Sequence, residues 1–214
     1  MKFVRTEGNM INKKKMKLTA VTFFSVIVMG FSLSLLNIVD LGTDPFTFMN
    51  LELSNALGIG FGNWEVILNV IMFVPVLFLG RKQIGIGTLF NMVLVGYSVE
   101  FFSWLWRHIS FDTAIDTMTA RLILMIPSLL IFVASAATYM SSDLGTAPYD
   151  ALPLIISERL PKVPFRLIRF AWDAAAVVVG AAFGGRVRIV TVLMVLFIGQ
   201  TVTFVKNKFF SNFK

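Results

Sequence analysis

The chain contains no cysteine and a single histidine, His108. Disulfide bonds are therefore excluded, and the His and Cys clusters that hold zinc or iron have no candidates. The sequence also contains no nucleophile elbow and no Gly-rich loop followed by Lys-Ser or Lys-Thr. Without these patterns we expect no enzymatic activity, no catalytic residue, no bound metal and no cofactor. His108 is expected to lie in a polar loop.

Charged residues are also scarce, at 14% of the 214 positions, whereas 57% are hydrophobic and 22 are phenylalanine. A soluble domain of this length could not bury so much apolar surface. Residues 18–39 and 122–142 form long runs without any charged residue. Each run can cross a hydrocarbon core of about 30 Å as a helix that rises roughly 1.5 Å per residue. The sequence therefore predicts an integral membrane protein.

Acidic residues are outnumbered, because 12 Asp and Glu stand against 19 Lys and Arg, which leaves a net charge of +7. In a membrane protein this excess is typical of cytoplasmic loops, so no nucleic-acid partner is expected. We expect residues 1–17 to form a basic cytoplasmic segment, followed by a retained first span rather than a cleaved signal peptide. Residues 206–214 are expected to form a basic cytoplasmic tail.

Six apolar segments can span a membrane: 18–39, 64–80, 84–106, 122–142, 167–185 and 189–205. Two shorter segments, 45–57 and 148–160, each follow one copy of a repeated motif, LGTDPF at 41–46 and LGTAPY at 144–149. Other pairs keep the same offset or one residue more, among them Asp40 with Asp143 and Asn69 with Asp173. We therefore expect a first membrane repeat at 18–106, a polar loop at 107–121 and a second repeat at 122–205.

The fold prediction depends on whether the short segments cross. If they do not, each unit has three spans and the second unit is inverted. The result is an all-α transmembrane helix bundle with a 3+3 inverted repeat. If they do cross, the protein has eight spans and the repeats are parallel. The distribution of Lys and Arg places both termini in the cytoplasm in either arrangement, and the short, charged segments favour six spans.

Each copy of the motif is predicted to break a membrane helix and to start a short one. Gly42 allows backbone conformations that other residues avoid. Asp44 is a good N-cap, and Pro45 suits the first turn of a helix. In the second copy Ala147 takes the place of Asp44. Asp150 then lies in the first turn, where a carboxylate interacts favourably with the helix N-terminus.

Paired broken helices at corresponding positions of two inverted halves indicate a substrate site near the middle of the membrane. The candidate binding residues at the two helix starts are Thr43, Asp44, Thr146 and Asp150. The free N–H groups of such helix starts favour a small polar or anionic solute. The alternative is an interfacial turn followed by an amphipathic helix on the membrane surface.

Polar residues within the predicted spans add further candidates. Asn69 and Asp173 occupy equivalent central positions, and Arg169 lies one turn before Asp173, within reach of an i,i+4 ion pair. We expect these three residues to line the cavity, with a pair that merely joins helices as the alternative for Arg169 and Asp173. Glu65 shares a helix face with Asn69. Snorkelling to the interface is an alternative for Glu65 and the favoured interpretation for Glu100.

The stretches LGTDPF, FGNWEVILNV and LGRKQIGIGTLFNMVLVG make the chain resemble the YczE/YyaS/YitT-type bacterial membrane proteins over roughly residues 18–205. The resemblance implies a protein of the bacterial plasma membrane, from a family that is largely uncharacterised. Members often carry Asp one position after the aromatic residue that follows the proline. This chain keeps it as Asp150 but has Thr47 in the first copy. YitT-type members often add a soluble C-terminal domain, so a chain that ends soon after Val205 is expected to be closer to the YczE subgroup.

The function expected from these features is transport of a small solute by alternating access between the two halves. The expected partners are the lipid bilayer, an unidentified polar or anionic solute and, as an alternative to a monomer, further copies of the chain. Two other functions remain open. One is a substrate-binding membrane subunit that works with a pair of ATPases, and the other is a membrane scaffold or regulator of biosynthetic enzymes.

Overall fold

The computed structural model describes residues 2–209, so Met1 of the predicted N-terminal segment and residues 210–214 of the predicted tail lie outside the described residues. Regular structure in the described range is helical throughout, which confirms the all-α prediction. The long helices are α1 (Lys2–Val39), α3 (Phe61–Leu79), α4 (Ile86–His108), α6 (Met118–Ser141), α8 (Phe165–Ala182) and α9 (Ile189–Phe209). The short elements are α2 (Pro45–Leu57), the 3-10 turn η1 (Arg81–Gln83), α5 (Phe111–Ala114) and α7 (Pro148–Arg159).

The long helices differ in how apolar they are. Over the described residues, α1, α3, α4 and α6 are long and apolar enough to cross a membrane. Helix α8 is more polar, because Arg166, Arg169 and Asp173 lie within its 18 residues. The polar loop predicted from residue 107 begins later than expected. His108 is still the last residue of α4, where its ring stacks on that of Trp104 with the centroids 5.3 Å apart.

The starts of the two short helices are built as the sequence predicts. Asp44 is the N-cap of α2, and its Oδ1 accepts a hydrogen bond of 3.1 Å from the backbone N–H of Thr47. Pro45 follows as the first helical residue, where the missing N–H costs nothing. Helix α7 also begins with a proline, but Ala147 has no side-chain oxygen for a cap, and Asp150 lies in the first turn instead. The two starts therefore present their carboxylates at different positions.

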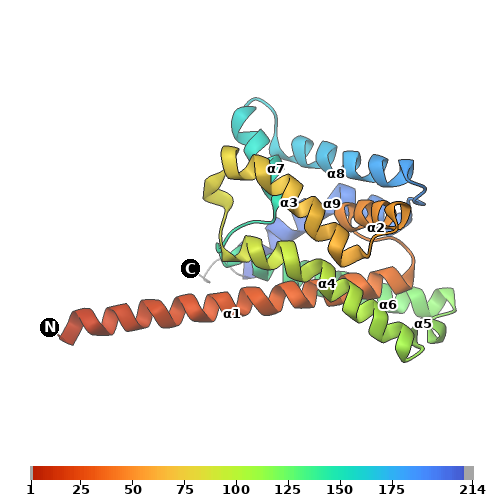
Figure 1. Cartoon of the computed structure of the whole chain (residues 1–214), viewed down its shortest axis with the longest axis horizontal. Coiled ribbons are helices and arrows are strands. Elements are labelled where there is room, and N and C mark those ends of the chain that lie inside the picture. The colour runs from red at the N-terminus through yellow and green to blue at the C-terminus, as the bar shows by residue number, and fades with distance from the viewer. Residues whose placement is uncertain (1, 210–214) are drawn as a thin grey trace.

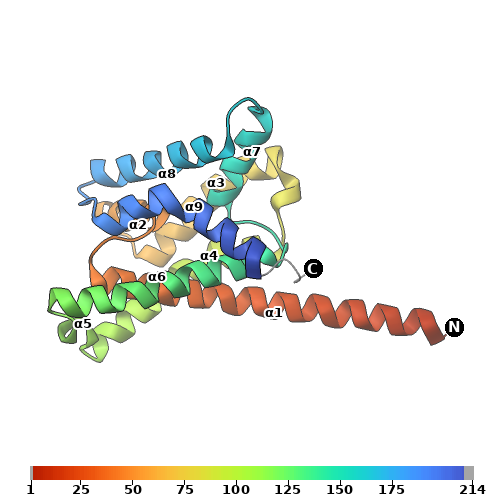
Figure 2. The ribbon, with the colours of Figure 1, turned by 180° about the vertical axis from the view of Figure 1, so that it is seen from behind.

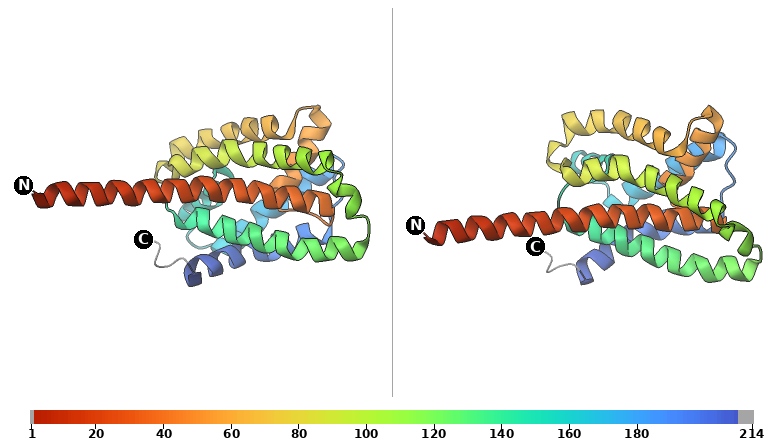
Figure 3. Two further views of the ribbon diagram at one scale, coloured as in Figure 1. Left: turned by 90° about the horizontal axis from the view of Figure 1, so that it is seen from below. Right: turned by 60° about the horizontal axis from the view of Figure 1, so that its bottom comes forward.

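Successive long helices run in opposite directions along the long axis of the molecule (Figures 1 and 3). Helix α1 packs against α4 and α6, and α9 packs against α6 (Figure 2). Buried side chains at these contacts form the main core, among them Val26, Leu33, Val99, Tyr139 and Met194. The first part of α1 extends well beyond the other helices (Figure 3).

Each short helix stays near one end of the bundle. Helix α1 ends and α3 begins at the same end of the molecule, so α2, which joins them, returns to the end from which it came (Figure 3). Helix α6 ends and α8 begins at the opposite end, where α7 joins them (Figure 1). The 13 residues of α2 would reach only about 20 Å as a helix, which is less than a hydrocarbon core of about 30 Å.

The short helices tie the two predicted units together. Helix α2 packs against α8 of the second unit as well as against α3, and α7 packs against α3 of the first unit as well as against α8. The turns before them form matching bonds. The carbonyl of Leu41 accepts from the N–H of Val190 at 3.0 Å, and that of Leu144 accepts from the N–H of Gly87 at 2.7 Å. Each turn is thus joined to the start of the last long helix of the other unit.

The glycines of the two turns are required by this crossed packing. Gly42 and Gly145 have φ angles of 112° and 111°, a region that side chains rarely adopt. A Cβ on Gly42 would collide with Thr191, and a Cβ on Gly145 would collide with Thr88. The same residue type is therefore needed twice for two reasons, the backbone conformation and the close approach of a helix.

Candidate functional site

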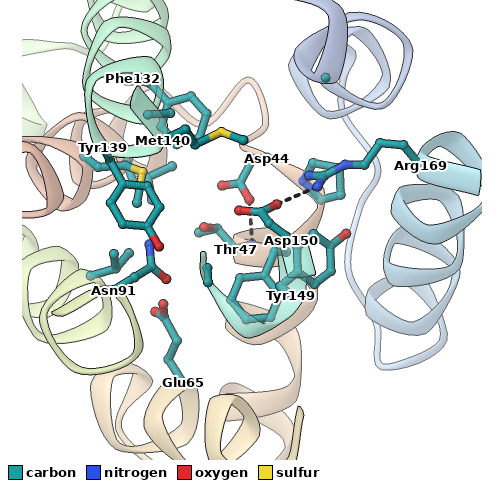
Figure 4. A pocket seen from close by; sticks show the side chains of 18 of the residues that line it. Asp44, Thr47, Glu65, Asn91, Phe132, Tyr139, Met140, Tyr149, Asp150 and Arg169 are labelled. Atoms are coloured by element: carbon teal, nitrogen blue, oxygen red, sulfur yellow. Dashed lines mark hydrogen bonds and ion pairs between the residues drawn. The ribbon is translucent and has the colours of Figure 1, made fainter. Parts of the chain in front are cut away.

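A cavity of about 130 Å³ lies where the first turns of α2 and α7 meet inside the bundle (Figure 4). Helices α1, α3, α4, α6, α8 and α9 also contribute to its walls. Polar lining residues include Asp44, Thr47, Glu65, Asn91, Asp150 and Arg169. Apolar and aromatic side chains separate these groups, so the cavity combines a few polar groups with a largely apolar wall, as small-molecule sites commonly do.

Arg169 of α8 is the centre of the polar side of the cavity. Its Nη1 lies 2.5 Å from Oδ1 of Asp150, and its Nε lies 2.9 Å from Oδ2 of Asp173. The i,i+4 pair predicted from the sequence is therefore present. The Asp173 side chain is fully buried, and its Oδ1 accepts a hydrogen bond of 2.6 Å from the hydroxyl of Tyr149. Asp173 therefore binds Arg169 and Tyr149 on the side away from the cavity, whereas Asp150 binds Arg169 at the cavity wall.

Aromatic rings join the two short helices at the cavity. The rings of Phe46 and Tyr149, the residues after the two prolines, have centroids 4.4 Å apart. Tyr149 also contacts Trp172 of α8 at 5.8 Å, and the guanidinium of Arg169 lies 5.3 Å from the centroid of its ring. The two helix starts are therefore in direct contact, with Tyr149 between the charged and apolar parts of the site.

The carboxylate of Asp44 accepts hydrogen bonds from residues of its own turn. Its Oδ1 accepts from the N–H of Thr47, and the hydroxyl of Thr43 donates to its Oδ2 at 3.3 Å. Among the described residues, no group of three or more His, Cys, Asp or Glu side chains is placed to hold a metal ion.

Glu65 of α3 is buried, with only 2% of the residue exposed. The snorkelling alternative for Glu65 is therefore wrong. Within the described part of the chain, Oε2 of Glu65 has no hydrogen-bond partner. This oxygen lies over Gly96 of α4, where an added Cβ would collide with it. The carboxylate points into the cavity towards Asn91 (Figure 4). Glu100, by contrast, is exposed, as expected.

The predicted site residues fall into two groups. Asp44, Asp150 and Arg169 line the cavity, and Asp173 supports Arg169 from behind. The structure therefore brings these four residues together from α7, α8 and the turn before α2.

The other three predicted residues lie outside the cavity lining. The N–H of Thr43 donates to Oγ1 of Thr191 at 3.2 Å. Thr146 bonds to Gln83 twice, through its N–H to the carbonyl at 2.8 Å and through its hydroxyl to Oε1 at 3.2 Å. Asn69 is fully buried, and neither amide atom has a hydrogen-bond partner among the described residues. The two threonines thus fasten the motif turns to the opposite unit.

Comparison with known proteins identifies the family. A family model described as a family of unknown function, DUF6198, matches residues 16–207. The chain belongs to the DUF6198 family. The match covers all of the predicted membrane segments, and no solved structure was found to match the chain.

Three relatives of this DUF6198 chain are uncharacterised bacterial proteins. The uncharacterized membrane protein YczE of Bacillus subtilis is 27% identical over 64% of this chain and 61% of YczE, so the chain spans about three fifths of that relative. The uncharacterized protein YyaS of the same organism is 27% identical over 79% of this chain and 83% of YyaS. An uncharacterized protein of Haemophilus influenzae is 24% identical over 89% of this chain and 84% of its own length. The expected resemblance to YczE and YyaS is confirmed, and with the apolar helices it identifies a multi-pass membrane protein.

Some cavity residues of the DUF6198 chain were missed from its sequence, although the repeat contained a signal for one of them. Glu65 is separated from Arg169 by the same offset that separates Asn69 from Asp173. Phe46 likewise corresponds to Tyr149. Extending the pairing of the two units to every residue of α3 would have selected Glu65, because its counterpart Arg169 was already a candidate. Phe46 and Tyr149 were identified only from the structure.

A second, open cavity of about 790 Å³ lies beside the first on the α2 side of the bundle. It is lined by Thr43 and by charged side chains that include Asp40, Glu52, Arg107 and Arg188. Thr43 faces this outer cavity, whereas the next residue, Asp44, faces the central one. The turn before α2 therefore forms the partition between the two cavities.

On the α7 side of the DUF6198 bundle, polar contacts link neighbouring segments of the chain. Nζ of Lys82 lies 2.7 Å from Oε1 of Glu158, and Gln83 makes the two bonds to Thr146 described above. These contacts join η1, between α3 and α4, to the two ends of α7.

Proposed function

We propose that this DUF6198 protein transports a small solute by alternating access, with the solute bound in the central cavity between two inverted three-span halves. The observation that carries the proposal is that the broken-helix starts of both units, Asp44–Thr47 and Ala147–Asp150, line one cavity. Paired half-helices that meet at one site are the arrangement of many secondary transporters. Irregular backbone of this kind is tolerated at membrane depth only inside protein or beside a cavity.

The crossed bonds support inverted halves. Leu41 and Leu144 are equivalent in the repeat, and so are their partners Val190 and Gly87. The long helices alternate in direction, so the first helix of the second unit, α6, runs opposite to α1 (Figure 3). A half-turn that exchanges the two units would convert one bond into the other, which is the relation between the halves of many transporters that work by alternating access.

The two cavities support a state that is open on the α2 side. The outer cavity leads to the partition at Thr43 and Asp44, whereas the α7 side is held by the Lys82–Glu158 ion pair and the bonds of Gln83. In the six-span arrangement, the excess of Lys and Arg places the α2 side outside the cell. The opposite state would open the α7 side by releasing those polar contacts.

Cysteine accessibility tests this proposal without knowledge of the solute, because the chain has no cysteine of its own. Thr47→Cys places a thiol on the central cavity. In vesicles of each orientation, we expect a small membrane-impermeant thiol reagent to modify it from both sides. Ser54→Cys, on the wall of the outer cavity, is the matched control and should react from the α2 side only. Reaction of Thr47→Cys from one side alone would rule out alternating access.

A further inference from the structure

The central cavity has an acidic balance. Among the described side chains at the site, four carboxylates (Asp44, Glu65, Asp150 and Asp173) stand against the guanidinium of Arg169, a formal excess of three negative charges. The N-termini of α2 and α7 contribute only about half a positive charge each. The negative charge of the carboxylates is therefore larger than the positive charge of the two helix ends. The helix dipoles taken alone would favour an anionic ligand.

The groups at the site are unequally satisfied. Arg169 is already bonded to Asp150 and Asp173, and Asp44 accepts bonds from its own turn. Glu65 is different, because its Oε2 has no partner in the described structure although the residue is 98% buried. Asp44, a second carboxylate, lines the same cavity. A buried carboxylate without a partner is costly unless a cation or a proton joins it.

The walls indicate what kind of cation fits. Phe46, Tyr149, Phe132 and Tyr139 line the cavity beside the acidic groups. The guanidinium of Arg169 lies over the ring of Tyr149, and the faces of aromatic rings of this kind attract organic cations. A volume of about 130 Å³ is close to that of an apolar cavity known to hold benzene, at roughly 150 Å³. A cation that fills this space has an apolar body of about six heavy atoms.

We infer that the solute of the central cavity is a small organic ammonium ion, with its charge against Glu65 and its apolar body against the aromatic wall. This inference rests on the proposed function and adds the class of its substrate. Asp44 adds a second carboxylate to the wall of the same cavity, whereas Arg169 is bonded to Asp150 and Asp173. Glu65 is thus the residue that selects the charge of the ligand.

Binding of three probes that share a compact, branched apolar body and differ in charge tests this inference. The full chain in lipid nanodiscs is titrated by calorimetry with tetramethylammonium, tert-butyl alcohol and trimethylacetate. We expect saturable binding of tetramethylammonium and at least tenfold weaker binding of the other two. Saturable binding of trimethylacetate, of potassium or magnesium ions alone, or of none of the probes would overturn the inference.

Two variants test whether Glu65 selects the charge of the ligand. Glu65→Gln should weaken tetramethylammonium binding at least tenfold, whereas Asp116→Asn, a change of the same charge at an exposed site between α5 and α6, should leave it unchanged. If Glu65→Gln does not fold, the probes on the unaltered chain still decide the class. Two-sided modification of Thr47→Cys without ammonium binding would leave the transport proposal standing and reject this substrate class alone.

Discussion

At the scale of single residues, Arg169 is where the charges of the cavity converge. It contacts one carboxylate of α7, one of its own helix and the ring of Tyr149, with 19% of its side chain exposed. Removing one member of a buried charge pair leaves the partner without compensation, which costs more than the pair contributes. Arg169 therefore bears on stability as well as on the shape of the site.

We expect Arg169→Gln to destabilise the protein by about 3 kcal/mol or more, because Asp150 and Asp173 would lose their common partner. Thermal unfolding in detergent, followed by the loss of monodisperse protein, measures the effect. Adding Asp150→Asn and Asp173→Asn to the same variant removes the uncompensated charges and should restore at least half of the loss. A single variant as stable as the parent chain would show that Arg169 is not needed to balance them.

At the scale of elements, the two LGTxP turns share a backbone conformation and a contact with the other unit, but they carry different side chains. Both glycines have nearly the same φ, and both turns bond to a helix start in the other unit. The caps differ, because Asp44 caps α2 from outside the helix and Asp150 lies within the first turn of α7. The backbone of the turns is thus duplicated, whereas their charges are not. The α2 and α7 sides should contribute unequally to ligand binding.

Gly145→Ala should be destabilising by more than the strain of its φ angle alone, about 1–2 kcal/mol. Its new methyl group would meet Thr88 and the backbone of Gly85. Gly184→Ala is the matched control, because Gly184 also has a positive φ, of 100°, but no described heavy atom lies within 4 Å of an added Cβ. Comparing the unfolding midpoints of the two variants separates the backbone strain, which both variants share, from the collision of the added methyl group, which only Gly145→Ala introduces. Equal losses in both variants would mean that close packing of the turn is unimportant.

At the scale of the whole molecule, the short helices determine how many times the chain crosses. At each short helix the chain turns back and leaves the bundle at the end from which it came (Figures 1 and 3). With α2 and α7 packed across the two units, each short helix is covered by long helices of both. This arrangement favours six crossings and places the two connecting regions, after α2 and after α3, at opposite ends.

Two single-cysteine variants test the six-span arrangement. Leu57 at the end of α2 is 50% exposed, and the side chain of Lys82 in η1 is 64% exposed. In intact cells, we expect an impermeant thiol reagent to modify Leu57→Cys but not Lys82→Cys, which should react only after the membrane is opened. The reverse pattern would support eight spans.

The positions of the helices could be predicted from the sequence, because hydrophobic runs and caps are local. The short helices begin at Pro45 and Pro148 as expected, and five of the long helices follow the predicted apolar segments within a few residues. Helix α1 ends at Val39 as predicted but begins at Lys2, because it includes most of the basic segment expected before the first span. The burial of Glu65 could not be predicted in this way. A glutamate near a helix start can snorkel, and only the approach of α4 at Gly96 closes that route.

Thr43 and Thr146 show the same difference between what a local pattern predicts and what tertiary packing decides. Both residues are next to a broken helix, so a local pattern places them in a binding site. In the structure, their partners are Thr191 and Gln83, which are distant in the sequence. A pattern within one turn carries no information about which distant segment will pack against that turn.

By itself, the sequence determined the membrane class, the family, the helical segments and the equivalence of the two motifs, because hydrophobicity, capping and repetition can be read along the chain. Only the tertiary structure decided that the starts of α2 and α7 meet, that Arg169 joins Asp150 to Asp173, and that Glu65 faces the same cavity. Those contacts link helices far apart in the sequence. They depend on how whole helix faces pack, which no local pattern specifies.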